Sequence, residues 1–191
     1  MQKLTTADIK DLPEYELERV EFRSRIIEMK RRRRISVGSL MTMVFENTET
    51  MRFQVQEVAR AERMLHDEQI AREVETFNEL IPGDGELSGT LFVDTADRVL
   101  LRELLPRLRG IERAMRIEVG AECVCVLQQE DRLVEEEITA TVHYLKFRFT
   151  PDQQVTFASG PVRIVIDHRA YQTSTELSPE QRAELARDFA G

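Results

Sequence analysis

The stretch VRIVIDHRAY, residues 162–171, decides the fold because apolar side chains recur on every second residue. The even-numbered positions from Val162 to Ile166 are all apolar, whereas Arg163 and Asp167 are charged. Alternation with this period is typical of a β-strand that buries one face. His168 continues the even-numbered series, so we expect its imidazole to face the buried side at the end of the strand.

A second strand is predicted over ITATVHYLKFRF, residues 138–149. Its alternation places His143 on the same face as Leu145, Phe147 and Phe149. Both strand histidines are therefore expected to point inward. An inward imidazole needs hydrogen-bond partners, because a buried polar group without one costs about 1–3 kcal/mol.

The remaining periodicity predicts a mixture of helices and strands. Helices are expected over 13–34, over 51–82 with a second helix capped by Asp67, over 96–109, after Thr150 as far as Gly160, and after Ser178. Further strands are expected over 35–45, 87–93, 114–119 and 122–127, and residues 130–137 form a solvated connection or a short helix. Hairpin-like neighbours favour an α+β fold with a mainly antiparallel sheet of about six strands, packed helices and an N-terminal helical region.

The chain length favours a single α+β domain over residues 1–191. Residues 1–82 are expected to be mostly helical with one strand, and residues 83–191 to be rich in strands. The connecting stretch PGDGE, residues 82–86, is too short to require two independent domains.

Composition restricts the class of protein. The formal net charge of −8 argues against a nucleic-acid-binding surface, which depends on clustered Lys and Arg. No stretch is long and apolar enough for a membrane span, and the N-terminal residues lack the apolar core of a signal peptide, so we expect a cytoplasmic location with no membrane partner. Cys123 and Cys125 are expected to be reduced, buried thiols that act as small apolar groups.

The helix expected from Met51 carries the polar side chains that could complete a site with the histidines. Imidazole and carboxylate suit Zn, Fe or Mn, so His143, His168 and Glu62 form a candidate metal site. No HExxH or ExxH spacing occurs, so such a site has to be assembled from distant segments. The alternative is that both histidines are core residues whose hydrogen bonds are satisfied.

The run KRRRR, residues 30–34, is the most concentrated charge in this acidic chain. Cations at the C-terminal end of a helix interact favourably with the helix dipole, which makes a solvated surface the simpler interpretation. The functional alternative is an anion-binding or acidic-partner site formed by Arg31, Arg32, Arg33 and Arg34.

Four segments together resemble an uncharacterised bacterial family known as domain of unknown function 3501. They are residues 45–63, 77–82, 142–149 and 166–171, and the similarity extends over nearly the whole chain. The resemblance implies an accessory role in an iron–sulfur or rubrerythrin-type redox system, with a redox protein as partner. It also emphasises a set of polar residues, which are Gln56, Glu57, Arg60, Glu62, Arg63, Asn78, His143, Asp167, His168 and Tyr171.

Two functions remain open from the sequence. The first is a non-enzymatic accessory or ligand-binding protein, whose candidate ligand contacts are Gln56, Arg60, Arg63, Asn78, Asp167 and Tyr171. The second is a metal-dependent or acid–base enzyme acting on a small anionic substrate, whose candidate catalytic groups are His143, His168, Glu62 and Glu57. A symmetric homodimer is expected because two-fold dimers are the commonest assemblies.

Overall fold

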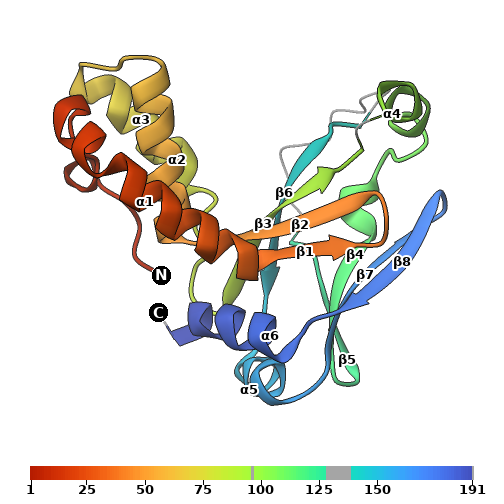
Figure 1. Ribbon diagram of the computed structural model, residues 1–191. Coiled ribbons are helices and arrows are strands. Elements are labelled where there is room, and N and C mark those ends of the chain that lie inside the picture. The colour runs from red at the N-terminus through yellow and green to blue at the C-terminus, as the bar shows by residue number, and fades with distance from the viewer. Residues whose placement is uncertain (96, 128–138, 191) are drawn as a thin grey trace.

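The computed structural model describes residues 1–95, 97–127 and 139–190 (Figure 1). It contains two antiparallel sheets of four strands each, with a group of helices on one side of them. In the part of the chain that the structure describes, no helix is long and apolar enough to cross a membrane. The α+β class predicted from the sequence is confirmed.

Each sheet is built from strands that are distant in the sequence. The first sheet has the order β1 (Arg34–Val37), β2 (Met41–Glu46), β3 (Glu86–Val93) and β6 (Val142–Arg148). The second has the order β5 (Glu122–Cys125), β4 (Met115–Val119), β7 (Val162–His168) and β8 (Tyr171–Glu176).

One hydrophobic core fills the space between the two sheets. It includes Leu91 and Phe147 of the first sheet together with Ile117 and Ile164 of the second. The sheets also meet at their edges: Thr175 Oγ1 of β8 donates to the carbonyl of Ser36 in β1, and Val126 forms an isolated bridge with Phe147. The alternation read from residues 162–168 therefore corresponds to one face of a β-sandwich.

Three helices form a separate group beside the sandwich, here called the helical part: α1 (Leu12–Arg33), α2 (Thr48–Ala61) and α3 (Asp67–Asn78) (Figure 1). The remaining helices are α4 (Arg98–Leu104), α5 (Pro151–Ser159) and α6 (Pro179–Ala186), with 3-10 turns η1 (Thr6–Asp8), η2 (Ile111–Ala114) and η3 (Arg187–Ala190). The helical part has its own apolar contacts, in which Tyr15, Phe22 and Ile26 pack with Phe53.

Side-chain caps explain where several helices begin. The Asp11 carboxylate accepts the amide of Glu14 at the start of α1, where Pro13 lies in the first turn. Capping boxes begin α2, α5 and α6 at Asn47, Thr150 and Ser178. Each cap satisfies amides that the first turn leaves without a helical partner.

The predicted count of about six strands is too low, because the described residues already form eight strands in two sheets. Residues 35–45 were expected to be one strand, but Gly38 adopts a left-handed φ of 71° and reverses the chain between β1 and β2. Strand β8 was not predicted because its sequence YQTSTE has no run of apolar residues on either face. Its alternation is between half-buried and exposed polar residues.

Several other expectations need correction. The two helices predicted within residues 51–82 are confirmed as α2 and α3, but the N-cap residue of α3 is His66 and not Asp67, and the helix predicted over 96–109 is shorter. Cys123 and Cys125 are unpaired as expected, but both are exposed, because Val124 occupies the core-facing position of β5. The segment predicted over 130–137 lies outside the described residues.

Candidate functional site

The two histidines singled out from the sequence lie in different sheets and face the interior between them. His143 shares its face of β6 with the buried residues Leu145 and Phe147. His168 ends β7 in phase with Ile166 and is 8% exposed. The inward orientation predicted from strand alternation is therefore confirmed for both.

His168 uses both ring nitrogens in hydrogen bonds with the backbone. Its Nδ1 accepts the amide of Ala170 at 3.3 Å, and its Nε2 lies 3.0 Å from the carbonyl oxygen of Arg109. A carbonyl only accepts, so the proton of a neutral imidazole is on Nε2. His168 thus joins the end of β7 to the segment after α4 and has no ring nitrogen left for a metal.

His143 is surrounded by other groups of the sandwich. Its Nε2 lies 3.3 Å from Thr139 Oγ1, and its Nδ1 lies 3.9 Å from Glu112 Oε2. Glu62, by contrast, is the C-cap of α2 in the helical part. The structure does not bring His143, His168 and Glu62 together, and no cluster of three metal-ligating side chains occurs among the described residues.

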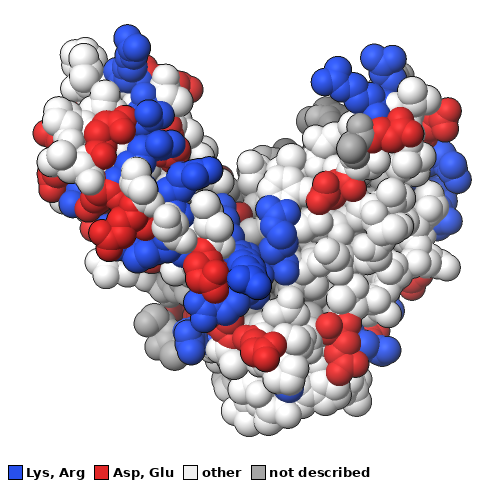
Figure 2. Space-filling view, in the orientation of Figure 1, with Lys and Arg blue, Asp and Glu red and all other residues white. Residues whose placement is uncertain are grey.

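A partly open groove lies in a different part of the molecule. A groove of about 220 Å³ lies between the helical part and the outer face of the first sheet. Neighbouring strands contribute alternate residues to its floor, in register with one another. The floor residues are Val44, Glu46, Thr90, Phe92, Val142 and Tyr144, and the walls are Lys30, Arg34, Met51, Gln54, Phe77 and Leu80. Figure 2 shows the surface hollowed between the helical part and the sandwich.

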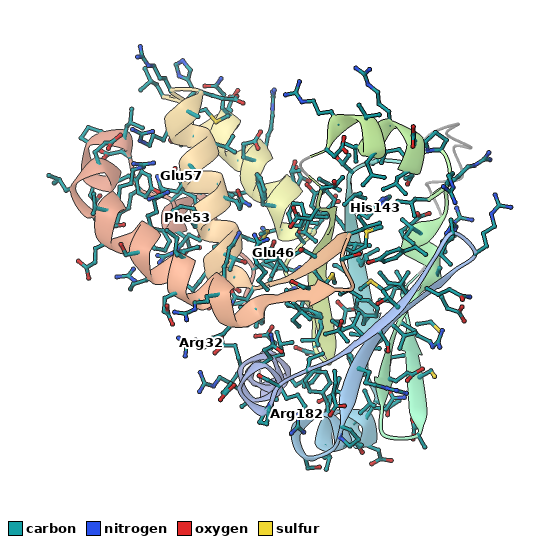
Figure 3. The ribbon with its side chains drawn as sticks, turned by 45° about the vertical axis from the view of Figure 1, so that its right-hand side comes forward. Arg32, Glu46, Phe53, Glu57, His143 and Arg182 are labelled. Atoms are coloured by element: carbon teal, nitrogen blue, oxygen red, sulfur yellow. The ribbon has the colours of Figure 1, made fainter. Side chains whose placement is uncertain are left out.

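Glu46 is the polar centre of this groove. It ends β2, is only 3% exposed, and lies between the helical part and the sheets (Figure 3). Its Oε1 accepts the hydroxyl of Thr90 at 3.0 Å. Its Oε2 lies 3.8 Å from Lys30 Nζ and has no hydrogen-bond partner among the described residues.

The chemistry of the groove suits a small molecule. Phe77, Phe92 and Tyr144 supply aromatic surface, whereas Lys30 and Glu46 supply a pair of opposite charges. Pockets that bind small ligands generally combine an apolar lining with a few fixed polar groups. A buried carboxylate oxygen without a donor costs about 1–3 kcal/mol, so a ligand that donates to it recovers that free energy.

A family model described as "Protein of unknown function (DUF3501)" matches residues 3–189. The chain belongs to the DUF3501 family. A crystal structure described as a novel protein of unknown function from Burkholderia pseudomallei K96243 is similar, with 29% sequence identity and a TM-score of 0.91 over 98% of this chain and 99% of that chain. No curated protein matches the chain significantly. The family resemblance predicted from the sequence is confirmed.

Two side-chain amides, those of Gln56 and Asn78, hold the N-terminal segment against the helical part. The Gln56 side chain accepts the amide of Lys10 at 3.0 Å and donates to its carbonyl at 2.8 Å. Asn78 makes the same pair of bonds with Leu4, at 2.8 and 2.9 Å. Each side-chain amide thus forms the two backbone hydrogen bonds that a neighbouring strand would form. Gln56 and Asn78 therefore hold the N-terminal segment in place.

Glu57 belongs to a cluster of α1 and α2 side chains in the DUF3501 fold. It accepts two hydrogen bonds from Arg19, at 2.7 and 2.8 Å, and one from the Tyr15 hydroxyl at 2.7 Å. The Arg19 guanidinium holds the pKa of the Glu57 carboxyl below its ordinary value, while burial and the Glu57 carboxylate raise the pKa of Tyr15. Figure 3 places Glu57 in the helical part, away from His143.

We expect Glu57→Gln to lower the free energy of unfolding by about 1–2 kcal/mol near neutral pH, because it removes a charge-assisted pair. A lowered folded-state pKa stabilises the fold above the unfolded value of 4.5, and this stabilisation is lost as the pH falls through the folded-state pKa. Urea unfolding at pH 7 and at pH 3 measures the effect. The difference from wild type should shrink at pH 3, while the exposed control Glu62→Gln should change little at either pH; a difference independent of pH would contradict the assignment.

Tyr171 and Asp167 lie in the sandwich, and each makes its own contacts there. The Tyr171 hydroxyl donates to the carbonyl of Val37 at 2.9 Å and accepts the amide of Leu40 at 3.0 Å. It therefore ties β8 to the turn between β1 and β2. Asp167 is exposed on the outer face of β7, where its carboxylate accepts from Gln172 at 3.0 Å.

Arg60 and Arg63 lie at the far end of α2, outside the groove lining. Arg60 Nε donates to Glu16 Oε1 at 2.5 Å. Arg63 has a left-handed φ of 51° at the turn after α2, where the amide of Met64 reaches back to the carbonyl of Ala59 at 2.9 Å. This bonding pattern is a Schellman motif, in which glycine is the usual residue.

The basic run does not form one surface, because helical geometry turns successive residues in different directions. Arg33 is 1% exposed, and its guanidinium contacts Asp188, Glu184 and two backbone carbonyls. Arg31 and Arg32 are exposed, and Figure 2 shows basic side chains gathered along α1. Arg34 lines the groove, so the four arginines predicted as one anion site have separate environments.

Sequence reasoning missed Glu46, although β2 contained a signal for it. The strand reads MTMVFE, and all six residues are buried. A strand that is buried on both faces lies between two layers, so an acid at its end is also enclosed. The clue was therefore the absence of an exposed face in β2, and not any spacing between residues.

Proposed function

We propose that this protein binds a small ligand in the groove between the helical part and the first sheet. The observation that carries the proposal is the Glu46 carboxylate, whose Oε2 is buried without a hydrogen-bond donor among the described residues and lies 3.8 Å from Lys30. Buried polar atoms in folded proteins generally have partners, and the exceptions concentrate at functional positions.

The ligand-binding function has more support than the histidine enzyme predicted as its alternative. Both ring nitrogens of His168 are engaged by the backbone, and Glu62 lies at the end of α2 and not beside His143. The link to an iron–sulfur or rubrerythrin-type redox system, the redox protein partner, the homodimer and the cytoplasmic location stay predictions.

Blocking the groove tests this function. Val142 is half-buried in the groove floor opposite Phe92, so we expect Val142→Trp to fill the space that a ligand needs. Val155 in α5 is 71% exposed, and Val155→Trp is the matched control. Ligand-observed NMR with mixtures of small carboxylic acids, amines and amino acids detects weak binding to the wild type and to both variants.

At least one class of compound should bind the wild type and Val155→Trp, with loss of binding in Val142→Trp. Thermal unfolding of both variants verifies that each is folded before binding is compared. Binding that survives in folded Val142→Trp, or the absence of binding by every class to the wild type, would contradict the proposal.

A further inference from the structure

We infer that the ligand is a zwitterionic α-amino acid with an apolar side chain. The inference rests on the proposed function, since it names the chemical class of ligand that the same groove takes. Three features carry it, which are the Glu46 oxygen Oε2 that has no hydrogen-bond donor among the described residues, the cations of Lys30 and Arg34, and the aromatic lining.

The groove contains a pair of opposite charges. Lys30 Nζ and Glu46 Oε2 are 3.8 Å apart, a distance that is longer than a hydrogen bond. Each group therefore keeps bonding capacity for a third group. Glu46 is an acceptor and Lys30 is a donor, so an adjacent ammonium and carboxylate on one ligand match them in opposite order.

Ligands that carry a single charge match the charged groups of the groove less completely. A simple anion placed beside Lys30 and Arg34 brings a second negative charge close to the buried Glu46 carboxylate. A simple cation beside Glu46 is repelled by the same two basic residues. Only a zwitterion gives Glu46 Oε2 a donor and also gives Lys30 and Arg34 an acceptor, so it satisfies groups that either singly charged ligand leaves unpaired.

The groove also offers apolar surface to the rest of the ligand. Met51, Phe77, Leu80 and Phe92 line the groove together with Val142, and they provide apolar surface for a hydrophobic side chain. The volume of about 220 Å³ is below the range of about 300–1,000 Å³ that is usual for drug-sized ligands. A single amino acid is a ligand of suitably small size.

The test compares an amino acid with analogues that lack one charge each. A thermal-shift screen of the standard amino acids comes first, and isothermal titration calorimetry of the full chain follows with L-phenylalanine, 3-phenylpropionate, 2-phenylethylamine and 3-phenyllactate, or with the equivalent series built on the best binder. The variants are Glu46→Gln, Arg34→Gln and, as a control on the exposed side of α1, Arg32→Gln.

The amino acid should bind the wild type at least about tenfold more tightly than each analogue. Glu46→Gln should weaken the amino acid about tenfold without weakening 3-phenylpropionate, because only the ammonium has lost its partner. Arg34→Gln should weaken the binding of the three carboxylates, L-phenylalanine, 3-phenylpropionate and 3-phenyllactate, but not that of 2-phenylethylamine. Arg32→Gln should leave all four affinities unchanged.

The outcomes separate this inference from the proposed function. If 3-phenylpropionate, 3-phenyllactate or 2-phenylethylamine binds as tightly as the amino acid, or if Glu46→Gln weakens all compounds equally, the zwitterion inference is overturned while the groove remains a ligand site. If no amino acid binds but other compounds do, and Val142→Trp abolishes their binding, the inferred ligand class is again wrong. The proposed ligand-binding function then stands. If neither amino acids nor other compounds bind, both fail.

Discussion

Replacing Arg33 with methionine is expected to lower the free energy of unfolding by about 3–5 kcal/mol. The Arg33 side chain is 1% exposed and contacts both carboxylate oxygens of Asp188, itself 3% exposed. It also donates to the carbonyls of Phe45 and Glu46. Methionine fills much of the same volume, but it leaves a buried carboxylate and two carbonyl groups without their donors.

Arg32→Met is the matched control, because it makes the same change at the neighbouring, exposed residue of α1. We expect it to change the free energy of unfolding by less than about 0.5 kcal/mol. Urea denaturation monitored by circular dichroism measures both variants. Similar losses for Arg32→Met and Arg33→Met would show that the stabilisation comes from the charge of the basic run and not from the buried contacts of Arg33.

Gly38→Ala is expected to lower the free energy of unfolding by about 2–3 kcal/mol, the second largest of the expected effects. Gly38 has a φ of 71°, which is unfavourable for a residue with a Cβ atom. An added Cβ would also collide with the Tyr171 hydroxyl and approach Thr173 Oγ1. Moving that hydroxyl breaks its hydrogen bonds with Val37 and Leu40, and with them the link between the β1–β2 turn and β8.

Gly110→Ala separates the two causes, because Gly110 has a φ of 83° but an added Cβ would have no atom within 4 Å among the described residues beyond its chain neighbours. Gly110→Ala should lower the free energy of unfolding by only about 1 kcal/mol, because it adds only the strain of a left-handed backbone. Thermal and urea unfolding of the two alanine variants, with Tyr171→Phe alongside, give the comparison. Equal losses for Gly38→Ala and Gly110→Ala would mean that the Tyr171 contact contributes nothing.

Strand alternation was the most informative feature of the sequence. It placed His143 and His168 on the inner faces of their strands, because burying one face fixes the parity of every residue in a strand. It could not show that the two strands belong to different sheets, because pairing between distant segments leaves no local pattern. Strand β8 was missed for a related reason, since its polar residues owe their position to pairing with β7.

The candidate polar residues were chosen from the sequence, but their roles depend on tertiary contacts. Gln56 and Asn78 were candidate ligand contacts, yet both bind the backbone of the N-terminal segment. Arg33 was grouped with its exposed neighbours because a run of five basic residues does not show which of them are buried. Successive side chains of a helix point in directions about 100° apart. Glu46 was missed as a site residue because the groove around it forms only when the helical part packs against the outer face of the first sheet.

Methyl NMR of methionine-labelled protein tests the groove most directly. The chain has seven methionines, and Met51 is the one that lines the groove among the residues that the structure describes. Titration with L-phenylalanine, 3-phenylpropionate and 2-phenylethylamine should shift the Met51 methyl signal in the wild type, and the shifts caused by the two compounds with an ammonium group, L-phenylalanine and 2-phenylethylamine, should be smaller in Glu46→Gln. Shifts confined to other methionines, or a Met51 signal that none of the three compounds moves, would contradict a ligand site centred on Glu46.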